Sequence, residues 1–241
     1  MDAHQPGNQE GKGRISSVAV LDLRHMKSVD ELRNIKGISS VATILLSDTF
    51  QGTLAGIPMS SVGSVITLAA GSKVNQIGGK LKLGGEFLEN PSADGSDILL
   101  VTGELLITSP PTQFGYKQLI VVGQLFIPRG SEGVLTPFIT QTSGEIIAYD
   151  HRNPRWFMGQ GRFGREFFDY LKEPITMILM GEFVIESDVS AELIREKVTE
   201  IIQMGVLKAA DKKLVPILTA LAVEQMSMIQ VSDKLEGEFH G

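Results

Sequence analysis

Arginine and aromatic side chains are concentrated in one segment of the chain. The range 150–172 holds four arginines and six aromatic residues, including the only tryptophan. Guanidinium groups bind carboxylates and phosphates through paired hydrogen bonds, and arginine and aromatic side chains dominate protein interfaces. We therefore predict that this segment recognises an anion or a protein partner. The predicted binding residues are Arg152, Arg155, Trp156, Arg162 and Phe163.

The same segment has two further interpretations. Its aromatic side chains could instead fill a groove of the fold, with the arginines in solvent. Residues 159–164, GQGRFG, match the G-x-G-x-x-G pattern of dinucleotide sites, which lies between a strand and a helix. The preceding residues follow Pro154 and make a poor strand, and the helix expected over about 165–171 is short. Glu186 stands where such a site places an acid, so nucleotide binding at the GQGRFG loop remains an alternative.

A repeated acidic position is the second candidate for chemistry. Glu104, Glu145 and Glu182 each follow a glycine of a recurring motif, and stacked strands would set them in a row about 4.8 Å apart. Such a row could hold a cation or cleave a glycosidic bond. A carbohydrate-active enzyme on a β-helix, using Glu104 and Glu145, is therefore an alternative function. A solvated face is the other interpretation, because Lys80 and Gln124 interrupt the row.

Most other catalytic arrangements are missing from the sequence. There is no cysteine, which excludes disulfides, thiolate catalysis and cysteine-ligated zinc. The four histidines have no partner at metal-ligand spacing, and no P-loop or G-x-S-x-G motif occurs. We predict no catalytic residue, no metal and no cofactor, and hence a non-enzymatic protein.

A glycine motif recurs along the chain and indicates the fold. Its clearest copies, at 99–107, 119–127 and 177–185, have an apolar run, a glycine and then alternating apolar residues. The motif glycines are Gly52, Gly79, Gly103, Gly123, Gly144, Gly181 and Gly205. In addition, the sequence that begins at Ile38 is similar to the sequence that begins at Met59. Repeats of this length are typical of stacked coils, in which glycine permits a bend between two short strands.

We therefore predict a mixed, β-dominated fold, namely a parallel β-solenoid of roughly 20–27-residue coils with helical N- and C-terminal caps. A β-sandwich or an α+β fold is the alternative. Ser28 to Glu31 form a capping box that predicts a short helix. Ser190 predicts a helix over about 191–203 that ends before Gly205, and a second helix is expected over about 213–225, with Pro216 in its first turn. A last strand is possible over 226–231.

The predicted organisation is one domain between two tails. Residues 1–14 and 232–241 are expected to be tails, and 15–231 a single solenoid domain. Within it, 150–174 is predicted as an insertion and 189–231 as a helical C-terminal cap.

Two resemblances follow from the repeats. The Gly-x-Leu-x-Ile motifs, at Gly79, Gly103, Gly123 and Gly144, resemble those of the bacterial, polymer-forming bactofilin family. The aliphatic residues that step by three from Leu32 resemble leucine-rich repeats. The resemblances imply a bacterial β-solenoid that assembles with itself.

The composition of the chain limits the classes of partner that it could bind. The 241 residues include 22 Lys and Arg against 28 Asp and Glu, a net charge of −6, which argues against nucleic acid as a partner. No apolar run is long enough to span a membrane, and the N-terminus has no secretory signal, so a cytoplasmic location is expected. We therefore predict a structural or protein-interaction scaffold that self-associates or binds a protein partner.

Overall fold

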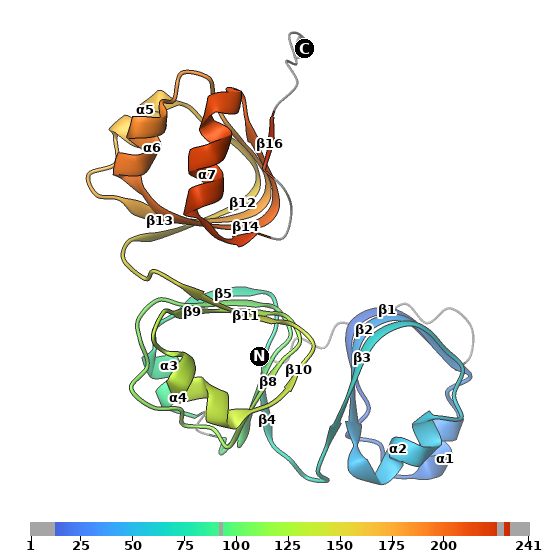
Figure 1. Cartoon of the computed structure of the whole chain (residues 1–241). Helices are drawn as coiled ribbons and strands as arrows, with labels where there is room; N and C mark the ends of the chain where they lie inside the picture. Colours follow the sequence, from blue (N-terminus) through green and yellow to red (C-terminus); the bar gives the residue numbers. More distant parts are fainter. Residues whose placement is uncertain (1–12, 92–93, 226–228, 232–241) are drawn as a thin grey trace. The chain divides into compact units, whose positions relative to one another are not determined.

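The computed structural model describes residues 13–91, 94–225 and 229–231, in which the chain forms two compact units. Figure 1 labels its helices and strands. The first unit contains most residues up to 146 and the second residues 108–110, 126–132 and those from 147 onward. The predicted tails lie outside the described residues, except Gly13 and Arg14. The predicted domain boundaries stay a prediction.

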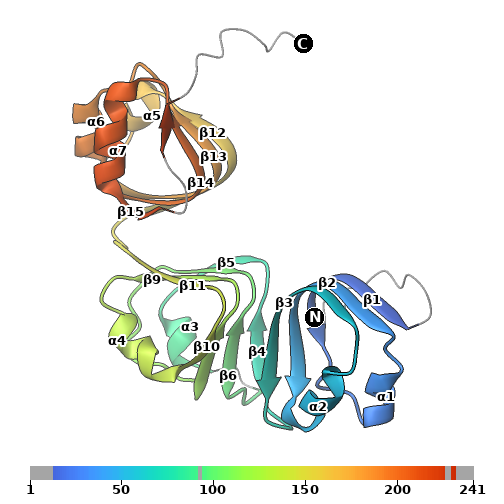
Figure 2. The same cartoon turned by 45° about the vertical axis from the view of Figure 1, so that its right-hand side comes forward.

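The first unit begins with a sheet of three bent strands (Figure 2). Its strands run parallel in the order β1-β2-β3, and a short helix follows each of the first two. The elements are β1 (Arg14–Asp22), α1 (Val29–Arg33), β2 (Gly37–Ser47), α2 (Gln51–Leu54) and β3 (Met59–Leu68).

Short strands in pairs then build two further sheets, of four strands each. One has the order β10-β8-β6-β4 and the other β11-β9-β7-β5, so successive pairs lie beside one another. The elements are β4 (Val74–Ile77), β5 (Lys80–Leu83), α3 (Glu86–Glu89), β6 (Ile98–Val101), β7 (Glu104–Ile107), β8 (Gln118–Val121), β9 (Gln124–Pro128), α4 (Glu132–Leu135), β10 (Ile139–Thr142) and β11 (Glu145–Tyr149).

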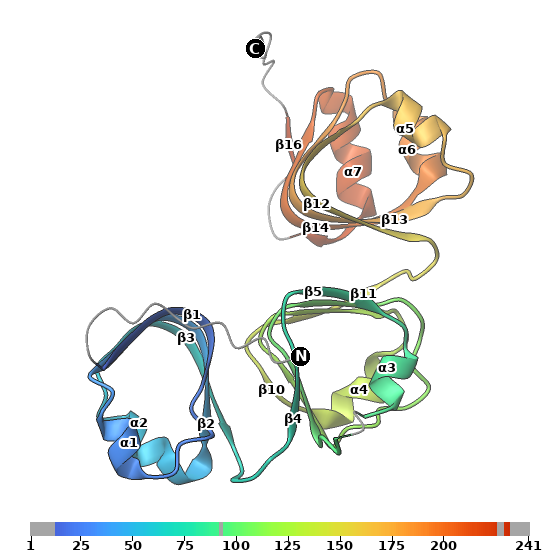
Figure 3. The same cartoon turned by 180° about the vertical axis from the view of Figure 1, so that it is seen from behind.

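The second unit has long bent strands in the order β12-β13-β14-β15, with β16 paired to β14. Figures 1 and 3 show its three helices side by side across the open side of the curved strands. The elements are β12 (Pro154–Phe163), α5 (Arg165–Asp169), β13 (Ile175–Ile185), α6 (Ala191–Lys197), β14 (Val198–Ala209), α7 (Val215–Leu221), β15 (Ala222–Gln225) and β16 (Gln230–Val231).

The prediction of a β-dominated fold with parallel sheets is confirmed. Every strand pair given for the described residues is parallel, which excludes the antiparallel sandwich there. In the same residues, no helix is long and apolar enough to cross a membrane.

The motif glycines stack directly on one another. A Cβ added to Gly123 would lie 2.0 Å from the carbonyl oxygen of Gly103, and one added to Gly144 would lie 2.0 Å from that of Gly123. In the second unit, Gly181 and Gly205 have the same relation to the glycine before them, at 2.0 and 2.2 Å. We call these sets the glycine columns, Gly79–Gly103–Gly123–Gly144 and Gly159–Gly181–Gly205. Only a residue without a side chain fits between neighbouring strands at this point.

Serine replaces glycine at the bend of the first sheet. Ser17, Ser40 and Ser61 lie at one level of β1, β2 and β3 and have φ angles of 58°, 53° and 54°. This left-handed conformation is uncommon for residues other than glycine and costs about 1 kcal/mol each. Gly52 lies instead in α2, so its assignment to the motif is wrong.

Both predicted C-terminal helices are shorter than expected. The side chain of Ser190 caps α6 as predicted, but this helix ends at Lys197 and Gly205 lies inside β14. Pro216 is in the first turn of α7, which ends at Leu221 and not near 225. Residues 198–209 are rich in β-branched and aliphatic side chains, and their parallel pairing with β13 outweighs the helical pattern. The predicted helical cap therefore contains strands β14, β15 and β16 as well as helices α6 and α7. Of the predicted strand 226–231, the first three residues lie outside the described part.

The glycine columns predict the effect of adding one methyl group. We expect Gly123→Ala to lower the free energy of unfolding by about 3 kcal/mol, because its Cβ would overlap a backbone carbonyl that cannot rotate away. Urea denaturation followed by circular dichroism measures this loss. Gly52→Ala is the matched control, since its Cβ would meet nothing within 4 Å and alanine favours the α2 helix. Equal stability of the two variants would refute the column as a constraint.

Candidate functional site

The segment predicted as an insertion supplies a strand of the sheet. β12 pairs with β13 over its whole length, with Gly159 opposite Gly181. This strand was not predicted, because it begins with Pro154 and lacks an apolar run. A proline is tolerated here because β12 is the edge strand of its sheet in the described residues.

Three of the four arginines in this segment are paired with carboxylates of their own unit. Arg152 binds Asp150, Arg162 binds Glu186 at 2.7 Å, and Arg165 binds Asp169 at 3.3 Å. The arginine side chain of each pair is exposed to solvent, so each pair contributes little to stability. They nevertheless occupy the guanidinium groups, so a partner would have to displace an internal carboxylate to reach them.

The aromatic side chains of the segment largely fill the core. Phe163 is 5% exposed and packs against Phe157, Phe167 and Phe183, with ring centroids 4.8 to 5.7 Å apart. Phe163 is therefore a core residue of this unit and not a surface contact. Trp156 is half-buried on the opposite side of β12, beside Phe126 and with its indole N–H directed at the sulfur of Met180.

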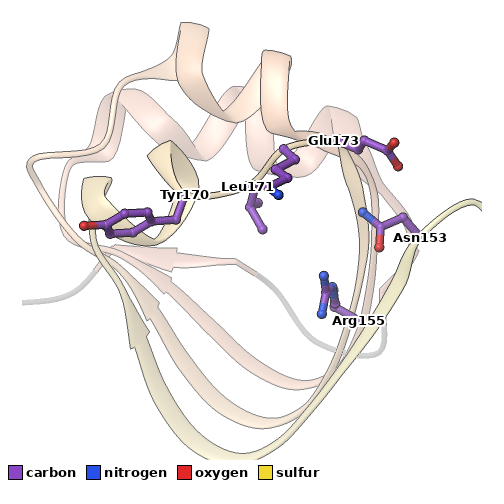
Figure 4. Close-up of a pocket in the computed structure, with 6 residues that line it drawn as sticks. Asn153, Arg155, Tyr170, Leu171 and Glu173 are labelled. Carbon is purple, nitrogen blue, oxygen red and sulfur yellow. The ribbon is translucent and has the colours of Figure 1, made fainter.

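Arg155 differs from the other arginines. No hydrogen bond or ion pair is found for its guanidinium in the described residues, and it lines a cavity of about 380 Å³ (Figure 4). The cavity is also lined by Asn153, Tyr170, Leu171, Lys172 and Glu173. The four lining residues from 170 to 173 directly follow α5. They were not predicted as binding residues, because it is the register of β12 that brings Arg155 close to them. Of the five predicted binding residues, Arg155 alone lines this cavity.

The GQGRFG segment does not form a phosphate-binding loop in this geometry. Gly159 and Gly161 lie within β12, and the Cβ position of Gly161 faces the ring of Phe183 at 3.1 Å. Gly164 is the N-cap of α5, a helix of five residues. Asp188 already accepts a hydrogen bond from the Arg165 backbone N–H there, at 3.2 Å. A nucleotide phosphate would meet a carboxylate in this position.

The predicted carboxylate row is divided between two sheets. Glu104 and Glu145 follow glycines of the first column, with Gln124 between them, and Glu104 pairs with Lys80 at 3.0 Å. Glu182 lies in the second unit, opposite Gln160, and pairs with Lys208. Two of the three carboxylates are thus held by a lysine, which leaves Glu145 as the unpaired member.

A buried carboxylate that the sequence analysis missed fixes the start of the second unit. Glu200 on β14 is 3% exposed; it accepts hydrogen bonds from Arg129, at 2.6 Å, and from the backbone N–H of Asp150. Asp150 in turn binds Arg152 and accepts a hydrogen bond from Thr176 through its carbonyl. Hydrogen bonds from the Arg152 side chain lower the pKa of the Asp150 carboxyl to about 2. The periodicity of the chain gives no signal for such long-range pairs.

Comparison of the chain with protein-family models, curated proteins and solved structures finds no match. The chemistry of a partner must therefore be inferred from the chain's own side chains. Among the charged groups without a partner in the described residues are Arg155, which lines the cavity, and Glu145 on the edge strand β11.

The lowered pKa of Asp150 predicts a pH-dependent contribution to stability. We expect Asp150→Asn to lower the free energy of unfolding at pH 7 by about 1 kcal/mol, a modest value because Arg152 is well solvated. A carboxyl with a lowered folded-state pKa stabilises above its ordinary value of 3.8 and loses this effect as pH falls toward 2. The difference between the variant and the original chain should therefore shrink between pH 4 and pH 2 in urea denaturation. Asp169→Asn, which removes an exposed pair, is the control; a difference constant with pH would contradict the prediction.

Proposed function

We propose that the protein is a non-enzymatic scaffold of stacked parallel coils, a β-solenoid, that associates with itself and presents its second unit to a protein partner. The glycine columns support the stacked arrangement, because each turn of chain repeats the same close backbone contact. The pairing of Glu104 and Glu182 with lysines weakens the carbohydrate-active alternative, which needs two carboxyl groups available to substrate.

The unpaired carboxylate at the edge of one sheet carries the proposal of self-association. β11 and β5 are the two edge strands of this sheet in the described residues. The Oε2 atoms of Glu104, on β7, and of Glu145, on β11, are both buried without a hydrogen-bond partner there, but Glu104 has the ammonium group of Lys80 at 3.0 Å, whereas no ion pair is found for Glu145 in the described residues. Such an atom is costly to leave unpaired. On β5, Lys80 occupies the position that corresponds to Glu145 on β11. Within the chain, Lys80 forms an ion pair with Glu104, which lies opposite it on β7.

A second copy would supply the missing cation. If β5 of the second copy paired with β11 of the first, Lys80 of the second copy would lie beside Glu145 of the first. This arrangement would repeat the contact between Lys80 and Glu104 within one chain. β5 also carries Lys82, and lysines on an edge strand oppose pairing with strands of unsuitable charge. The edge therefore favours an acidic counterpart, which β11 provides.

Light scattering coupled to size-exclusion chromatography tests this function. We expect the apparent mass to exceed 26.1 kDa and to rise with protein concentration. Glu145→Lys should return the mass to that of the monomer, because two lysines would then face each other at the new contact. Glu166→Lys, with the same charge change at an exposed position of the second unit, should leave association unchanged.

A charge reversal separates this contact from a general effect of net charge. Glu145→Lys and Lys80→Glu in one chain should restore association, since the pair between copies is re-formed with opposite sign. A chain that is monomeric up to about 1 mM, a concentration at which even weak contacts associate, would refute self-association.

A further inference from the structure

Arg155 is an exposed residue of the edge strand β12, in line with two core residues of the neighbouring strands. It lies opposite Met177 on β13, and Met177 lies opposite Ile201 on β14. Met177 and Ile201 belong to the hydrophobic core of the unit, between the strands and the helices. Arg155 thus continues an inward-facing row, and Figure 4 shows its side chain on the side of the strand that faces the helices. An apolar side chain at position 155 would extend the hydrophobic row of Met177 and Ile201 to the edge strand, whereas arginine places a positive charge there.

The surroundings of Arg155 suit a single negative charge. Lys172 is a second exposed cation in the cavity lining, and no interaction of its side chain is given among the described residues. Glu173 also lines the cavity, so the three charged residues carry one net positive charge. A phosphate monoester carries a charge close to −2 and would be opposed by Glu173, whereas a carboxylate fits both the charge and the planar fork of a guanidinium.

The remaining lining residues indicate a peptide as the source of this carboxylate. Leu171 gives the cavity an apolar surface, and Tyr170 is 79% exposed. Exposed tyrosine beside arginine is typical of the energetically dominant residues of protein interfaces. A volume of about 380 Å³ accommodates one or two side chains.

We infer that this cavity binds a Glu or Asp side chain of an acidic peptide segment, with Arg155 as its main cation and Lys172 as the second. The inference rests on the proposed interaction function and names the chemistry of the partner. It does not depend on self-association, which involves β5 and β11 of the first unit.

Fluorescence anisotropy with a labelled Gly-Glu-Leu-Glu-Gly peptide tests this site on the full chain. We expect saturable binding with a Kd below about 1 mM and no binding of the matched peptide with Gln in place of Glu. Arg155→Met, which introduces the residue type of its neighbour in the row, should weaken binding about tenfold. Arg165→Met removes the same charge outside the cavity and should leave binding unchanged. Glu173→Gln should tighten binding about twofold, a gain that misfolding cannot produce.

Each outcome supports or refutes the site. A Kd above about 1 mM, equal binding of the Gln peptide, or unchanged binding by Arg155→Met would overturn it. Displacement of the peptide by inorganic phosphate at lower concentration than by acetate would overturn its preference for a carboxylate. Glu145→Lys should retain full peptide binding, so failure of self-association and failure of this site are distinguishable.

Discussion

The close contact between successive backbones at the glycine columns is the constraint on which the rest of the structure depends. The carbonyl oxygen of one glycine occupies the space where the next residue's Cβ would stand, as between Gly103 and Gly123. This contact aligns neighbouring strands in one register, with Lys80 opposite Glu104 and Arg155 opposite Met177. A slip by one residue would place core side chains in solvent, so the positions of the strand residues Lys80, Glu104 and Arg155 follow from the columns.

Much of the strand arrangement could be predicted from the sequence, because glycine between apolar runs reports a bend directly. The motif glycines from Gly79 to Gly205 all lie in columns, although Gly159 was assigned to an insertion. The helical pattern after Ser190 was correct only to Lys197, since periodicity within one strand cannot reveal its partner. The alignment of Ser17, Ser40 and Ser61 was indicated only by the similarity between the sequences that begin at Ile38 and at Met59. Composition does not reveal that Ser40 adopts a left-handed conformation.

The candidate site was less predictable than the fold. The concentration of arginine and aromatic residues placed the predicted site on the segment that forms β12, yet it did not separate Phe163, in the core, from Arg155, which lines a cavity. That distinction depends on which face of β12 each residue occupies, and on carboxylates as distant in sequence as Glu186. Ion pairs between separate turns of the chain are set by register, which no local pattern encodes.

Parallel pairing gives each sheet two unlike edges, and this polarity has a consequence for any assembly. A copy that adds its β5 edge to β11 exposes its own β11 in turn, so the contact is heterologous and does not close into a symmetric dimer. Growth would be directional and open-ended, in the manner of a filament. Each added chain would also bring a net charge of −6, so repulsion between the copies would oppose the growth of such a filament.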